Sequence, residues 1–218
     1  MTVTIAEELL LLAHAEDDGR PLIGGTQLDP ALAGAILAEL AINERIELSA
    51  KKVSVRDATP LGAAELDASL ARMAEERRER KPAWWVQKLY SAKLRNRLLT
   101  GLADAGVLSE RRGRVLGVFP TARWPEVDGS VEAEVRSRVA AALAGQDPDP
   151  RTAVLIALMR AAKLDRKAFP GADKKRIKEI AEGAWAADAV AQTIAAINSV
   201  VVTAAIAAGA AAVGGGSS

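Results

Sequence analysis

The sequence predicts a mainly α-helical protein, consisting of a single globular helical domain with two short β-hairpins. Half of the residues are hydrophobic but only 3% are aromatic, a composition that suits closely packed helices. Apolar residues recur at helical spacing along most of the chain. The only proline-rich break is the short segment 146–150. We therefore expect one domain over residues 1–213 and a flexible Gly/Ser tail over 214–218.

The first two helices follow from capping residues. Thr4 and Glu7 have the spacing of a capping box, which predicts a helix over residues 4–15. Asp29 precedes Pro30, and this pair predicts that a second helix begins there and continues to about residue 43. Breaking residues at 16–21 separate the two helices.

The later helices follow from prolines and from apolar spacing. Thr59 and Pro60 predict the start of a third helix that continues to about residue 80, where Pro82 ends it. Further helices are expected near 83–105, 130–144, 150–163, 173–182 and 185–212. Alternating residues at 45–48 and 52–55 predict one hairpin, and 107–120 predicts another that turns at Arg111-Arg112-Gly113.

The composition excludes several classes of function. Without cysteine, the chain has no disulfide or thiolate metal site, and its single histidine, His14, cannot form a histidine-rich site. No nucleophile, phosphate-loop or zinc-hydrolase motif is present. We therefore predict a protein that is not an enzyme and needs no metal or other cofactor.

Residues 189–213 carry no charge and are long enough to cross a bilayer. Alanine and valine dominate the segment, and polar side chains interrupt it, so we interpret it as a buried core helix. The N-terminus has no basic leader before an apolar core, so we expect a cytoplasmic protein.

The charge distribution suggests a contact with an anionic surface. The whole chain carries a formal net charge of +1, yet residues 72–114 contain twelve Lys or Arg and only five Asp or Glu. An apolar segment, 115–120, follows directly. Lipid headgroups and nucleic acid are the two candidate partners. The first part of the run, 72–81, resembles a helix face whose own Glu residues partly neutralise it.

A winged-helix DNA-binding protein is the alternative interpretation. A basic helix near residue 94, a turn and a hairpin would then place a recognition helix in the major groove and residues 111–114 against phosphates. DNA-binding domains usually have a clear positive excess, whereas this chain is nearly neutral. We therefore expect no nucleic-acid partner.

Several segments, in order, carry a resemblance to a known family. They are the Glu-Glu-Leu-Leu-Leu-Leu run at 7–12, Asp-Asp-Gly at 17–19, the apolar helix at 32–41, Asp-Ala-Thr-Pro-Leu-Gly at 57–62, the basic helix at 94–97, Gly-Val-Leu at 106–108, and the later positions Arg151, 155–156 and 168–169. Together they resemble the Golgi phosphoprotein 3 family of phosphatidylinositol 4-phosphate-binding adaptors over residues 5–206. The alanine-rich, short-looped sequence is similar to bacterial, actinobacterial-type members.

The resemblance implies a helical domain without catalysis, peripheral on membranes, whose pocket of one Trp and three Arg holds the inositol phosphate. The Trp position is Gly24 here and two Arg positions are Ala33 and Ala92, so only Arg95 is retained. Specific phosphatidylinositol 4-phosphate binding is therefore not expected. We expect Arg95 and three further cations to form a less selective site for anionic lipid headgroups. These cations are Arg97, Lys93 and Arg20.

The resemblance also implies a role for the apolar hairpin. Val115, Leu116, Val118 and Phe119 match the family loop that contacts membrane or another subunit, and Trp124 follows as an interfacial aromatic. We expect a peripheral, adaptor-like protein on the inner face of the cell membrane, with a protein cargo and self-association through residues 107–120. A scaffold without a lipid ligand is a further alternative.

Overall fold

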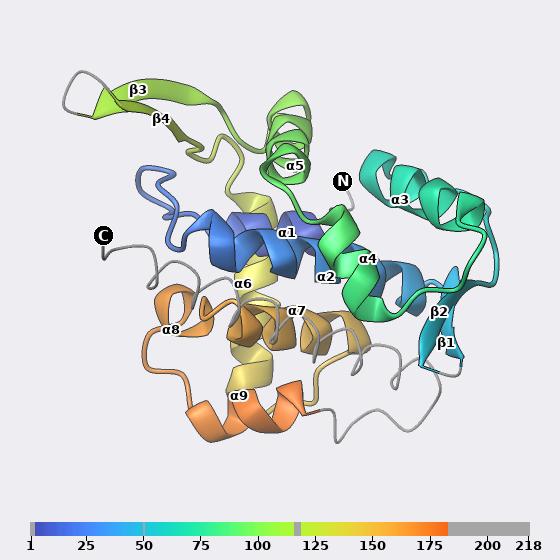
Figure 1. Cartoon of the computed structure of the whole chain (residues 1–218). Coiled ribbons are helices and arrows are strands. Elements are labelled where there is room, and N and C mark those ends of the chain that lie inside the picture. The colour runs from blue at the N-terminus through green and yellow to red at the C-terminus, as the bar shows by residue number, and fades with distance from the viewer. Residues whose placement is uncertain (1–2, 50, 116–118, 183–218) are drawn as a thin grey trace, which may run out of the picture.

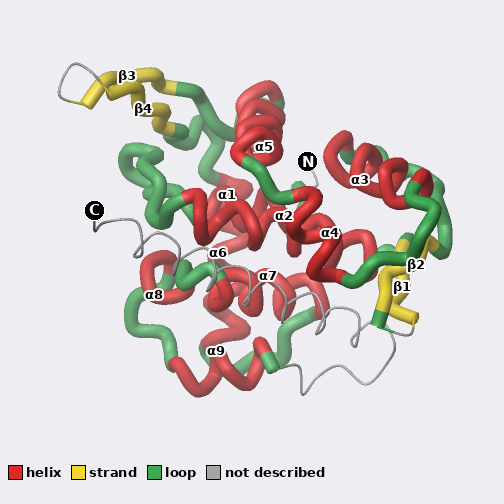
Figure 2. Tube along the Cα trace, viewed as in Figure 1, coloured by secondary structure: helices red, strands yellow, loops and turns green. Residues whose placement is uncertain are grey.

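The computed structural model, which describes residues 3–49, 51–115 and 119–182, confirms the mainly helical fold with two hairpins (Figures 1 and 2). The helices within these ranges are α1 (Ile5–Leu12), α2 (Gly25–Ile42), α3 (Ala64–Glu75), α4 (Pro82–Leu89), α5 (Ala92–Asp104), α6 (Ser130–Leu143), α7 (Pro150–Ala161), α8 (Asp165–Ala168) and α9 (Lys174–Ala181). The strands are β1 (Ile46–Ser49), β2 (Lys52–Val55), β3 (Arg111–Val115) and β4 (Phe119–Arg123), which pair as two antiparallel hairpins.

Helix α2 forms the centre of the core. It packs against α1, α3, α4, α5 and α7, and almost every residue from Leu28 to Ala41 is buried. A helix that is apolar on all sides must be surrounded by other elements, which is the position that α2 occupies in Figure 1.

The capping box at the start of α1 is confirmed. The Glu7 backbone N–H donates to Thr4 Oγ1 at 3.3 Å, and Glu7 Oε2 accepts from the Thr4 backbone N–H at 2.6 Å. Two of the otherwise unpaired N–H groups at the helix start are thereby satisfied.

The predicted start of the second helix is wrong. Helix α2 begins at Gly25, and Pro30 lies inside it rather than at its first position. No side chain caps this first turn. Its contacts are tertiary instead, because Leu28 is buried in the core and Asp29 pairs with Arg95 of α5.

The long helix predicted over 83–105 is in fact two helices. The backbone is extended at Ser91, with φ −172° and ψ 155°, and Ser91 Oγ accepts from the Leu94 N–H at 3.1 Å. Ser91 is therefore the N-cap of α5 and interrupts the helical run. Helix α3 is also shorter than predicted, and Pro82 is the first residue of α4 rather than a residue that ends α3.

The two hairpins differ in how well they were predicted. The first hairpin is confirmed, with β1 and β2 antiparallel and Ile46 opposite Val55, although β1 begins and ends one residue later than predicted. In the second hairpin the predicted turn at Arg111-Arg112-Gly113 is wrong, because these residues lie within β3 and pair with 121–123 of β4. The arginines expected at the tip of a DNA-binding wing therefore lie along a strand.

The remaining predicted helices near 130–144, 150–163 and 173–182 correspond to α6, α7 and α9, while the short α8 was not predicted. The helix expected over 185–212 and the tail 214–218 lie outside the described residues. Within the part of the chain that the structure describes, no helix has both the length and the apolar character needed to cross a membrane.

Candidate functional site

Helix α5 divides the predicted cations between two separate hollows. One face of the helix, which includes Leu94 and Leu98, is buried in the core. Arg95 lines a hollow of about 230 Å³ on one side of α5, whereas Lys93 and Arg97 line another of about 250 Å³. Residues 93 and 97 are one helical turn apart and share a face, while residue 95 points away from both. The three cations therefore do not form a single site.

The first hollow, here the Arg95 hollow, is defined by His14, Gly24, Gly25, Arg95 and Trp124. Arg95 Nη1 donates to Asp29 Oδ1. A side chain at position 25 would collide with the Arg95 guanidinium, so Gly25 makes room for this ion pair. Burial raises the pKa of Asp29, and the charge of Arg95 opposes that rise. Arg95, the one pocket cation that the resemblance predicts to be retained, is therefore already paired.

His14 and Trp124 form part of the wall of the Arg95 hollow. His14 is buried, its Nδ1–H donates to the Leu10 carbonyl at 2.8 Å, and burial lowers its pKa. Trp124, expected as an interfacial aromatic, is only 8% exposed. Ala33 is fully buried in α2, and Arg20 lies at the surface beside Asp18, with 3.6 Å between Nε and Oδ1. Arg20 therefore does not reinforce Arg95.

The second hollow, here the cationic hollow, is formed by α3, α4 and α5. Four cations line it, namely Arg72, Lys88, Lys93 and Arg97, together with the carboxylate of Glu65 and the side chains of Ser69 and Ser91. Glu65 pairs with Arg97 through two hydrogen bonds, Nε to Oε1 at 2.5 Å and Nη2 to Oε2 at 2.8 Å. These bonds raise the pKa of Arg97. Among the described residues, no carboxylate pairs with Arg72, Lys88 or Lys93.

One further feature of the cationic hollow suits an anion, and a neighbouring residue suits a membrane surface. The N-terminus of α5 lies at its wall, with Ser91 and Lys93 among the lining residues and no acidic residue in the first turn. Unpaired backbone N–H groups and the helix dipole favour negative charge at such an end. Tyr90 lies between the lining residues Leu89 and Ser91 and is 44% exposed. An exposed aromatic beside cations is typical of a membrane-interface surface.

Lys93 and Arg97, which the sequence predicts for an anionic site, both line the cationic hollow, and so do Arg72 and Lys88, which are not among the predicted site residues. The sequence favours a self-neutralised helix face for residues 72–81 and one continuous helix for 83–105. The break at Ser91 brings α4 beside α5, and with it Lys88, whose Nζ lies 5.7 Å from the centre of the Trp84 ring. Ser91 followed by an apolar helical run was the available signal.

The second hairpin projects from the helical body, and α5 lies between it and α3 in the view of Figure 1. Val115 and Phe119 form the last described pair of its ladder. Leu116 and Val118 lie outside the described residues. A lipid or subunit contact through 115–119 therefore stays a prediction.

Two of the buried carboxylates have a structural role. Glu8 and Glu39 are buried, and Arg138 and Arg151 bind them from α6 and α7. Within the described residues, no group of three or more acidic or histidine side chains is arranged to hold a metal ion.

A comparison with known families identifies a match that covers most of the chain. The family described as Golgi phosphoprotein 3 (GPP34) matches residues 5–197. No curated protein matches the sequence closely enough to add to this finding. The matched region includes the whole described helical body, from α1 to α9, and therefore both hollows.

Proposed function

Because the chain belongs to the Golgi phosphoprotein 3 family, a family of non-enzymatic adaptors, we propose that it binds peripherally to anionic lipid surfaces through the cationic hollow. Its place would be the cytoplasmic side of the cell membrane, where it would hold a protein cargo near the lipid. The observation that carries this proposal is the imbalance of charge in the hollow, where four cations face one carboxylate.

The magnitude of the attraction follows from the unpaired cations. Glu65 neutralises Arg97, which leaves Arg72, Lys88 and Lys93 to interact with phosphate oxygens. Each Lys or Arg near an anionic membrane surface contributes about 1 kcal/mol. Three such side chains therefore account for roughly a 100-fold preference for anionic over neutral lipid. Tyr90 adds an aromatic side chain at the same surface.

The Arg95 hollow supports lipid binding less well. Arg95 pairs with Asp29, and the positions of the other family cations hold Ala33 and Ala92. A phosphate entering there would have to displace the half-buried carboxylate of Asp29 from the Arg95 guanidinium. We therefore propose that anionic lipid is held on the opposite side of α5, between α3 and α4.

Flotation with vesicles tests the proposal. Wild-type protein, the triple variant Arg72→Gln, Lys88→Gln, Lys93→Gln, and a matched control with Arg166→Gln, Lys174→Gln, Lys175→Gln would be mixed with vesicles of increasing anionic content at two salt concentrations. The control removes three exposed cations from α8 and α9. We expect the triple variant to lose roughly 100-fold in affinity and the control to lose far less.

The outcomes separate the alternatives. Equal binding by the triple variant and the wild type would reject the cationic hollow as the lipid site. Salt-sensitive binding to duplex DNA without vesicle binding would support the winged-helix alternative. Binding to neither would support a scaffold without a lipid ligand.

A further inference from the structure

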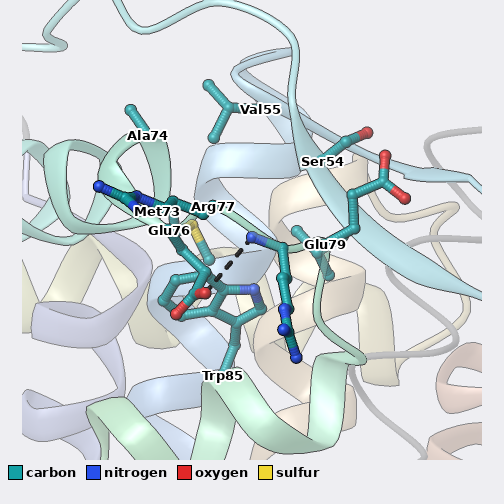
Figure 3. Close-up of a pocket in the computed structure, with 10 residues that line it drawn as sticks. Ser54, Val55, Met73, Ala74, Glu76, Arg77, Glu79 and Trp85 are labelled. Carbon is teal, nitrogen blue, oxygen red and sulfur yellow. Dashed lines mark hydrogen bonds between the residues drawn. The ribbon is translucent and has the colours of Figure 1, made fainter.

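A further pocket, separate from both hollows, lies between the first hairpin and the end of α3 (Figure 3). This pocket, here the Trp85 pocket, has a volume of about 160 Å³, and its lining includes Val53, Val55, Met73, Arg77, Arg78 and Trp85. In Figure 3 the indole of Trp85 forms its floor, below Met73 and Glu76. It shares no lining residue with the cationic hollow.

The backbone geometry explains why the pocket is open. Helix α3 ends at Glu75, and the chain then returns towards the edge of β2. It meets this edge at one position, where the Val53 N–H donates to the Arg80 carbonyl at 2.8 Å. Residues 76–79 do not continue the ladder, so a gap remains between them and β2.

The floor of the pocket carries a buried donor without an acceptor. Trp85 is only 2% exposed, and its Nε1–H has no hydrogen-bond partner among the described residues. The nearby Arg80 Nε–H is also buried without a partner. Buried polar groups are nearly always paired, and an unpaired donor is destabilising. An acceptor that enters the pocket would therefore satisfy the Trp85 Nε1–H and stabilise this region.

One carboxylate that lines the pocket, that of Glu76, is engaged elsewhere. Glu76 Oε1 accepts from Arg80 Nη2 at 3.2 Å and from the Arg78 backbone N–H at 3.4 Å. These bonds hold it against its own loop, as the dashed line in Figure 3 shows for the backbone bond. Among the described residues, the pocket therefore supplies no acceptor for the Trp85 Nε1–H.

The walls of the pocket define the chemistry of that acceptor. Arg77 and Arg78 are exposed at its rim, and no carboxylate among the described residues pairs with either side chain. An arginine binds a carboxylate through two parallel hydrogen bonds. The pocket wall also includes the apolar side chains of Val53, Val55 and Met73, which can contact the short hydrocarbon part of a ligand. Glu76 and Glu79 also line the pocket and would repel a dianion such as a phosphate monoester.

We propose that the Trp85 pocket binds a small aliphatic carboxylate, present as a free acid or as the C-terminal residue of a peptide. One carboxylate oxygen accepts from Trp85 Nε1–H, and the guanidinium of Arg77 or Arg78 pairs with the group. The aliphatic part lies against Val53, Val55 and Met73. A ligand of this size is expected to bind with a dissociation constant of millimolar order.

Nuclear magnetic resonance of the indole N–H groups tests the proposal on the full chain. The chain has four tryptophans, and Trp85→Phe identifies the Trp85 signal, with Trp85→Tyr as a second variant if that protein fails to fold. Titration with isovalerate should shift this signal to saturation, and methyl isovalerate should not. A tripeptide that ends in valine, as the free acid and as the amide, distinguishes a chain end from a free acid.

Two double variants separate binding from folding. Arg77→Ala with Arg78→Ala should weaken carboxylate binding by about tenfold or more. Lys52→Ala with Arg56→Ala removes two exposed cations of the same hairpin region outside the pocket and should leave binding unchanged. Absence of a saturable Trp85 shift with every carboxylate, or equal shifts with acid and ester, would overturn the proposal. Vesicle binding is measured separately. Its proposed site, the cationic hollow, shares no lining residue with the Trp85 pocket, so the two proposals can fail independently.

Discussion

Substitution of Arg151 by methionine should destabilise the protein strongly, because this side chain joins two buried carboxylates. Its Nε bonds Glu8 Oε1 at 3.1 Å, its Nη1 bonds Glu39 Oε1 at 2.6 Å, and its Nη2 donates to the Val3 carbonyl. Glu8 is 3% exposed and Glu39 is 6% exposed. Arg151 therefore connects α7 to both α1 and α2.

The magnitude depends on what remains after the substitution. Removal of one partner from a buried ion pair usually costs about 3–5 kcal/mol, because the other charge stays buried without compensation. Here Arg138 still holds Glu8 at 2.7 Å, and the Ile5 N–H still donates to Glu39 at 2.7 Å. We therefore expect a loss of about 3 kcal/mol, a large part of the roughly 5–15 kcal/mol that stabilises a typical domain.

Urea denaturation measures this loss as a shift in the transition midpoint at constant slope. Arg166→Met, at an exposed position on α8, is the control and should change the free energy of unfolding by less than about 0.5 kcal/mol. The double variant Arg151→Met, Glu39→Gln should recover much of the loss, because the amide needs no counter-charge and can still accept from the Ile5 N–H.

The pH dependence provides a further check. Burial already raises the pKa of Glu39, and Arg151 is the main group that opposes this rise. In Arg151→Met the pKa of Glu39 should rise further, so the deficit in stability should be largest at neutral pH and shrink as the pH falls and the carboxyl binds a proton. A loss below about 1 kcal/mol, or a deficit that grows in acid, would refute this reasoning.

Three further substitutions test other parts of the structure. Asp29→Ala should leave Arg95 unpaired and increase the affinity for anionic vesicles about fivefold in flotation; no gain would show that the Arg95 hollow is closed to phosphate. Glu132 is buried beside Glu126, and burial and this neighbour raise its pKa to about 8, against Arg136. Its contribution to stability is present below pH ~4.5 and lost as the pH rises to about 8, so Glu132→Gln should flatten the fall in the free energy of unfolding over this range, as measured by urea denaturation at several pH values. Ser91→Ala removes the N-cap of α5 and should cost about 1 kcal/mol in urea denaturation, whereas Thr100→Ala, at an exposed position within the same helix, should not destabilise the protein.

Local sequence signals predicted the fold where the structure depends on neighbouring residues. Thr4 and Glu7 satisfy each other within one turn, so the start of α1 could be predicted from four residues. The start of α2 could not, because its first turn depends on Leu28 in the core and on Asp29 bound to a residue 66 positions later. Ser91 lies between these cases, since its capping chemistry was visible but the apolar spacing on both sides favoured a continuous helix.

The candidate site shows why a charge count identifies a region but not a binding face. The basic segment contains Arg80, Arg95, Arg97 and Arg112, each paired in the structure with a carboxylate. Two of these partners, Asp29 and Glu65, come from outside the segment, on α2 and α3, so no count within it could include them. The cations Arg72, Lys88 and Lys93 come from three different helices, and tertiary packing together with the break at Ser91 places them around one hollow. An anionic ligand interacts most strongly with cations that lack a partner, and which cations these are is decided by tertiary structure.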